Sequence, residues 1–163
     1  MNNYNSSFET ITLEKEIKLF NLLKPNIPSS LSPQYIDTYC KFQLSNSTTI
    51  NWLYREKEKF LIYSFIKTKI NEDLFDIQSA YGYSCPMTNQ KDLLFIERSQ
   101  NSFSEWAKEN NILVEFIRFH PLLESNIKNC WCKNFGKLTN NRPTIYIDLG
   151  QSNILSGFRD SHR

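Results

Sequence analysis

The stretch that most constrains the fold is residues 60–70. Residues 60–66 are apolar almost throughout, and the whole stretch is rich in β-branched and aromatic side chains. Such side chains favour extended backbone, and a strand that is apolar on both faces is stable only where both faces are covered. We therefore predict a central β-strand over residues 60–70, with packed elements on each side of its sheet.

Two amphipathic helices are predicted before this strand. Residues 1–11 are polar and are expected to be frayed. From Thr12, a residue type that caps helices, apolar side chains recur at helical spacing until Pro25. Ser32 and Pro33 have the pattern of an N-cap followed by proline at the first helical position. The second helix is expected to end in the polar run 45–49.

Further strands and one further helix are predicted after these. Ser102-Phe103-Ser104-Glu105 has the form of a capping box and predicts a short helix that ends at Asn110-Asn111. Residues 92–97 fit either a strand or the start of a helix. The other expected elements are strands at 50–55, 75–78, 112–119 and 144–149, a charged turn at 56–59, a polar loop at 86–91 and the start of a helix at 151–163. This alternation predicts a single α/β domain over residues 1–163, with its core in residues 30–150.

Charge and hydropathy exclude several functional classes. The chain of 163 residues has a formal net charge of +2, with Lys and Arg scattered among nearly as many Asp and Glu, so no specific DNA binding is expected. Residues 1–26 show neither the basic region nor the continuous apolar region of a secretory signal, and no apolar run approaches a membrane span. We expect a cytoplasmic protein without a transmembrane segment.

The four cysteines are Cys40, Cys85, Cys130 and Cys132. In a chain without a secretory signal they are expected to be free thiols rather than a disulfide framework. Cys130-Trp131-Cys132 lacks the spacing of a zinc site, and no histidine lies near it in sequence. No metal site is predicted.

Candidate binding residues lie where two predicted strands end. The first strand breaks into Tyr81-Gly82-Tyr83, with Gln78 and Ser79 as hydrogen-bond donors just before it. Gly82 would let a ligand approach the backbone between the two rings; the alternative is that both tyrosines belong to the core and that Gly82 serves the turn alone.

Arg118 and His120 lie at the end of the other strand. The guanidinium of Arg118 suits a phosphate or a carboxylate, and the competing interpretation is a salt bridge to Glu115 or Asp148. His120 has the pKa range of a general base, but no Ser, Cys or Asp is placed by sequence as its partner. A histidine that is hydrogen-bonded to backbone is therefore the preferred interpretation, and no catalytic residue is assigned.

Three motifs in order resemble the N-terminal half of the FemABX-like acyltransferases of the GNAT superfamily. They are Ser79-Ala80-Tyr81-Gly82-Tyr83 with Pro86, Arg118-Phe119-His120-Pro121-Leu122 with Asn126, and Thr144-Ile145-Tyr146-Ile147-Asp148-Leu149, preceded by the helix that Ser32-Pro33-Gln34-Tyr35 opens. The resemblance covers about residues 30–163. It implies a GNAT-like mixed β-sheet flanked by helices, as the first of two tandem GNAT-like folds, with the chain cut in the helix that leads to the second.

The resemblance also implies a function. The family transfers an acyl or aminoacyl group, from acyl-CoA or aminoacyl-tRNA, to an amine. This chain would be the acceptor-side portion, which binds a sugar or peptidoglycan-type precursor and is inactive alone. The implied acceptor-binding residues are Tyr81, Gly82, Tyr83, Arg118 and His120. A non-catalytic module that binds an anionic sugar or peptide, and a gene fragment without function, are the alternatives.

The sequence departs from the family in the first motif and in the donor site. Ala80, Ser84 and Cys85 stand where relatives tend to have one proline and two glycines, which removes residues that readily adopt positive φ. The glycine-containing pattern that holds the CoA pyrophosphate has no match around Gly82, Gly136, Gly150 or Gly157. No cofactor site is predicted in this chain.

Overall fold

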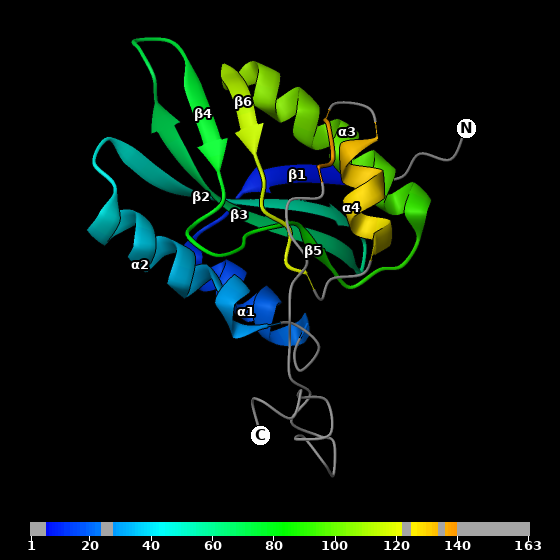
Figure 1. Ribbon diagram of the computed structural model, residues 1–163. Coiled ribbons are helices and arrows are strands. Elements are labelled where there is room, and N and C mark those ends of the chain that lie inside the picture. Colours follow the sequence, from blue (N-terminus) through cyan, green and yellow to red (C-terminus); the bar gives the residue numbers. More distant parts are fainter. Residues whose placement is uncertain (1–5, 24–27, 122–124, 134–135, 140–163) are drawn as a thin grey trace, which may run out of the picture.

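The computed structural model describes residues 6–23, 28–121, 125–133 and 136–139. Within these residues, a six-stranded mixed sheet carries helices on both faces (Figure 1). The fold is therefore of the α/β class, as predicted. The predicted strand 144–149 and the predicted helix 151–163 lie outside the described residues.

The sheet runs in the order β1-β2-β3-β4-β6, with β5 paired to β3. All neighbouring strands are antiparallel except β4 and β6, which are parallel. The elements in chain order are β1 (Ser6–Thr10), α1 (Leu13–Leu23), a 3-10 turn (Ser29–Leu31), α2 (Pro33–Gln43), β2 (Ser47–Glu56), β3 (Lys59–Lys69), β4 (Phe75–Gln78), β5 (Met87–Thr88), α3 (Leu93–Glu109), β6 (Ile112–Phe116) and α4 (Ser125–Cys132).

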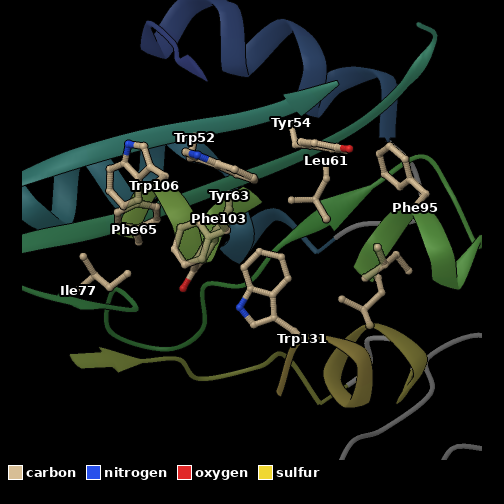
Figure 2. Packing of buried hydrophobic residues seen from close by; sticks show 12 residues of the cluster. Trp52, Tyr54, Leu61, Tyr63, Phe65, Ile77, Phe95, Phe103, Trp106 and Trp131 are labelled. Atoms are coloured by element: carbon tan, nitrogen blue, oxygen red, sulfur yellow. The ribbon is translucent and has the colours of Figure 1, made fainter. Parts of the chain in front are cut away.

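The prediction of a central strand is confirmed. β3 lies between β2 on one side and β4 and β5 on the other, and the residues from Phe60 to Ile66 are all buried. Alternate side chains of β3 enter two different cores. One core, against α3 and α4, is a cluster of aromatic rings (Figure 2). The other contains Phe60 and Ile62 and packs against α1 and the residues that follow it.

Both predicted helix starts are confirmed. Thr12 Oγ1 accepts a hydrogen bond from Lys15 N at 3.3 Å, and Ser32 Oγ accepts one from Tyr35 N at 3.3 Å, with Pro33 in the first turn. These bonds satisfy backbone donors that have no partner within the helix. Since the signal is local, the sequence alone was sufficient to place α1 and α2.

Two predictions near the chain's beginning and middle are wrong. Residues 6–10 are not frayed but form β1, which pairs with β2, and the Phe8 ring stacks on Trp52 with centroids 6.4 Å apart. The short helix at 102 is part of the long helix α3, which begins after the N-cap Asp92. Its buried face contains Phe95, Ile96, Phe103 and Trp106, with the polar residues Ser99 and Gln100 between the two apolar pairs. The capping-box pattern therefore falls inside the helix.

Element ends show smaller differences. β2 begins at Ser47 inside the run expected to be polar loop, because Ser47 Oγ and Thr68 Oγ1 form a cross-strand hydrogen bond of 2.9 Å. The polar loop 86–91 contains β5, and the strand expected at 112–119 ends at Phe116. The last difference matters for the site, because the chain beyond Phe116 follows a loop instead of a strand.

Candidate functional site

Strand β4 leads into a closed loop, residues 79–84, which is bonded to the end of the parallel strand β6 and to the chain that follows it. At its start, Ser79 N donates to Phe116 O at 3.0 Å. At its end, Ser84 N donates to Arg118 O at 3.2 Å. The Ser79 hydroxyl ties both ends together, since it accepts from Arg118 N at 2.8 Å and donates to Ser84 O at 2.8 Å. This network holds the loop against the chain that leaves β6.

Gly82 serves the backbone of this loop. Its φ is +97°, a conformation that side chains disfavour. A Cβ atom built there would meet nothing within 4 Å. The glycine is therefore required by the turn, and its position faces open space.

A pocket of about 140 Å³ lies between this loop, α2 and the end of β6. Its walls combine aromatic rings with one cationic and several polar side chains. The lining residues are Tyr39, Gln78, Ser79, Ala80, Tyr81, Phe116 and Arg118. Two of the five predicted site residues, Tyr81 and Arg118, thus meet at one hollow.

Tyrosines of α2 hold the loop in place beside the pocket. Tyr35 and Tyr39, four residues apart on one helix face, stack with ring centroids 6.4 Å apart. Tyr39 in turn stacks on Tyr81 at 6.5 Å, and the Tyr35 hydroxyl donates to Tyr81 O at 2.7 Å. The aromatic wall is therefore anchored to a capped helix, although the Tyr81 side chain itself is largely exposed.

Arg118 presents its guanidinium without an anionic partner among the described residues. The residue is exposed, and only its backbone groups are bonded to the loop. Glu115, one of the two competitors, lies on the other face of β6, where its carboxylate accepts from Tyr63 Oη at 2.9 Å and Trp131 Nε1 at 3.4 Å. The other competitor, Asp148, lies outside the described residues.

Tyr83 and His120 do not line the pocket. Their rings contact each other edge to face, with centroids 4.8 Å apart, and Tyr83 packs against the core under α1. His120 is buried, and this burial lowers its pKa, an effect to which the charge of Lys128 adds. The neutral imidazole packed on Tyr83 fits a structural role better than that of a base at the pocket.

The three residues that depart from the family motif all point inward. Ala80, Ser84 and Cys85 are buried, and Ser84 Oγ donates to Ser64 O. Burial raises the pKa of the Cys85 thiol to about 12, so it stays protonated at neutral pH and is a poor nucleophile. The three side chains thus occupy protein interior, and the loop keeps its single positive-φ glycine.

A buried carboxyl group lies beneath this face of the sheet. Glu16 of α1 is fully buried and accepts a hydrogen bond from Ser64 Oγ. Burial raises the pKa of Glu16 from 4.5 to about 7, although the bond from Ser64 opposes the shift. Sequence analysis missed Glu16 because it sits in an amphipathic helix among charged neighbours.

Sequence analysis also missed Tyr39 and Phe116 as pocket residues. The signals existed, since Tyr35 and Tyr39 are spaced to share a helix face and Phe116 shares a strand face with Arg118. What the sequence lacked was the contact of the α2 tyrosines with Tyr81 in the loop 79–84, which brings Tyr39 to the same pocket as Phe116.

The described residues contain no group of three or more side chains that could hold a metal ion, and Cys40, Cys85, Cys130 and Cys132 are free thiols. No helix in the described part of the chain is long and apolar enough to cross a membrane. Comparisons with models of protein families, with curated proteins and with solved structures found no match to this chain.

Proposed function

We propose that this chain is the acceptor-side portion of an acyl- or aminoacyltransferase of the FemABX-like kind, and that it binds an anionic acceptor in the pocket of Tyr81 and Arg118. The observation that carries the proposal is the guanidinium of Arg118, which lines the pocket beside aromatic walls and has no carboxylate partner among the described residues. The mixed sheet with a parallel β4–β6 pair is in keeping with the fold that the motifs imply.

The pocket suits the charged end of a ligand. A planar guanidinium pairs with a carboxylate or phosphate through two parallel hydrogen bonds, and Gln78 adds an amide to the same wall. Sites for drug-sized molecules measure about 300–1,000 Å³, whereas this one has about 140 Å³. The pocket therefore takes a head group, and the rest of the acceptor lies across the neighbouring surface.

Binding is assigned to this chain, and transfer to a second half. The pocket-lining residues include no cysteine, histidine or carboxylate, so the lining lacks the side chains that most often take a proton from an attacking amine. The donor, acyl-CoA or aminoacyl-tRNA, would be held by the second fold that the resemblance implies. The same lack of an acid or base also favours the second candidate, a binding module that takes part in no transfer.

Calorimetry on the purified chain tests the binding. Small amino acids, sugar phosphates and nucleotide sugars are titrated into the wild type, Arg118→Gln and Arg55→Gln. Arg55 is an exposed arginine on β2, away from the pocket, and serves as the matched control. We expect binding of an anionic member that Arg118→Gln weakens about tenfold or more and Arg55→Gln leaves unchanged. Absence of heat with every anion would contradict the proposal.

A transfer assay tests the assignment of this chain to the acceptor side. The chain is incubated with the bound acceptor and with acyl-CoA or charged tRNA, and the product amide is measured by mass spectrometry. We expect no product from the chain alone, for the acceptor-side portion and for the simple binding module alike. Turnover by this chain would overturn both candidates.

A further inference from the structure

β6 is an edge strand whose outer side is unpaired within the described residues. It is the last strand of the sheet, and its described neighbour is β4. The carbonyl of Phe116 and both backbone groups of Arg118 bond toward the loop that follows β4. Because backbone groups of successive strand residues point to opposite sides, the amides and carbonyls of Glu115 and Ile117 point outward.

The exposed side chains of β6 are apolar. Val114 and Phe116 are 51% and 58% exposed, and Leu113 on the other face is 60% exposed. Alternation places Val114 and Phe116 on the same face as Arg118. An edge that is unpaired in the described part of the chain and carries exposed apolar side chains is a template for another strand, and proteins ordinarily block such edges with charge, proline or a covering element.

We propose that an extended peptide with a free C-terminal carboxylate adds to β6 as a further strand, and that its carboxylate binds Arg118. The peptide runs parallel to β6, so that its end reaches the pocket into which β6 leads. Its backbone pairs with Glu115 and Ile117, and its alternate side chains contact Val114 and Phe116. This inference rests on the proposed function, because it names the class of anionic acceptor that the Arg118 pocket takes.

Charge complementarity favours a peptide over a second copy of this chain. A second β6 would bring Val114, Phe116 and Arg118 to this face, and none of them is an anion. Its Glu115 is on the opposite face and already accepts from Tyr63 and Trp131. A peptide end supplies one carboxylate for the one guanidinium of the pocket, together with the backbone groups that a sugar or a nucleotide lacks.

The test uses the full 163-residue chain and a synthetic hexapeptide, acetyl-Lys-Val-Thr-Val-Thr-Val, as the free acid and as the C-terminal amide. We expect the acid to bind about tenfold or more tightly than the amide. Arg118→Gln removes this difference, and Arg55→Gln keeps it. N-methylation of alternate peptide amides distinguishes the two peptide edges, since methyl groups on the edge that faces β6 abolish binding and those on the other edge do not.

Hydrogen exchange reports whether the edge is used. Addition of the peptide acid is expected to protect the amides of Glu115 and Ile117 and to leave that of Phe116, which faces β4, unchanged. If acetate or N-acetyl-valine binds Arg118 as tightly as the hexapeptide and no amide gains protection, strand addition is overturned and the anion pocket stands. If no carboxylate or other anion responds to Arg118→Gln, both proposals fall. Protection of the two amides without peptide would overturn the inference. It would assign the edge to a second copy if it depends on protein concentration, and to another segment of this chain, such as the predicted strand 144–149, if it does not.

Discussion

The two faces of the sheet are built differently. The face toward α3 and α4 is closed by rings, with Phe103 in contact with Trp52, Tyr63 and Trp131 (Figure 2). The face toward α1 and α2 is covered by two separate apolar clusters with few aromatic rings, and it also contains a buried carboxyl group and the pocket of Tyr81 and Arg118. The aromatic core and the pocket therefore lie on opposite sides of β3.

Buried polar atoms mark the same division. Five buried side-chain atoms in the described residues lack a hydrogen-bond partner: Glu16 Oε2, Thr49 Oγ1, Asn51 Oδ1, Trp52 Nε1 and Asp76 Oδ1. All but Trp52 Nε1 belong to the α1 and α2 side by strand alternation. Since an unpaired buried polar group costs about 1–3 kcal/mol, most of this cost falls on the layer that forms the pocket.

The largest expected effect is on the aromatic face. Replacing Phe103 with Ala removes a ring that contacts its neighbours at centroid distances of 5.2 to 5.7 Å, and we expect the free energy of unfolding to fall by about 3–5 kcal/mol. Urea denaturation measures it. Phe42→Ala, at a ring that is 80% exposed on α2, is the control and should change stability by less than about 0.5 kcal/mol. Equal losses at the two positions would remove the contrast between the faces.

The second effect is a pH dependence from the α1 side. Because the pKa of Glu16 is about 7 in the folded chain against 4.5 unfolded, the folded state holds a proton that the unfolded state has lost between these values. Stability from this group is therefore complete below pH 4.5 and is lost as pH rises through 7. The full difference is about 3 kcal/mol.

Denaturation at about pH 5 and about pH 8, in the wild type and in Glu16→Gln, measures this contribution. Between these two pH values, the free energy of unfolding of the wild type should fall by about 3 kcal/mol more than that of Glu16→Gln. His120, whose pKa is lowered, favours the folded state as pH rises, but it does so in both proteins and leaves their difference unchanged. Glu14→Gln, an exposed position of the same helix, should behave as wild type. Parallel slopes for the wild type and Glu16→Gln would contradict this account.

The aromatic face was largely predictable from sequence, and the reasons are physical. Residues 60–66 and the buried face of α3 are signals of period and composition. On the opposite face of the sheet, Ser32 and Thr12 act in a similarly local way, on backbone donors within one turn. Such interactions are complete within a few residues. Two parts of this face were not predicted. The start of α3 was missed because a local capping pattern was weighed above the longer buried face, and no element was assigned to the residues that form α4.

The binding face was predictable only in part. Tyr81 and Arg118 were placed at strand ends by sequence, but the pocket needs Tyr39 of α2 and Phe116 as well, and its shape depends on how the helix packs. Glu16 is bonded to Ser64, 48 residues away, and β1 pairs with β2, about 46 residues away. No local pattern specifies such distant partners. Tyr83 and His120 were grouped with the pocket because sequence proximity does not show which side of a loop a ring occupies.

A smaller effect is expected from Tyr35→Phe. The variant loses the hydrogen bond from the hydroxyl to Tyr81 O, at a cost of about 0.5–1 kcal/mol, and keeps the stack with Tyr39. Because this bond anchors the loop 79–84 to α2, hydrogen exchange at Gly82 and Tyr83 should become faster while that of β3 stays unchanged. Uniform acceleration over the whole chain, as global destabilisation would produce, would contradict a local role for this bond.

The smallest effect on stability, and the sharpest on binding, is expected from Arg118→Gln. The side chain is exposed and has no ion pair among the described residues, whereas the bonds that hold the loop come from its backbone. The free energy of unfolding should therefore change by less than about 0.5 kcal/mol, while affinity for the anionic ligand falls about tenfold or more. Thermal denaturation and calorimetry on the same preparation give both values. Lost stability with unchanged affinity would show that Arg118 stabilises the fold and does not bind the ligand. The α1 and α2 face would then lack the residue on which the binding proposal depends.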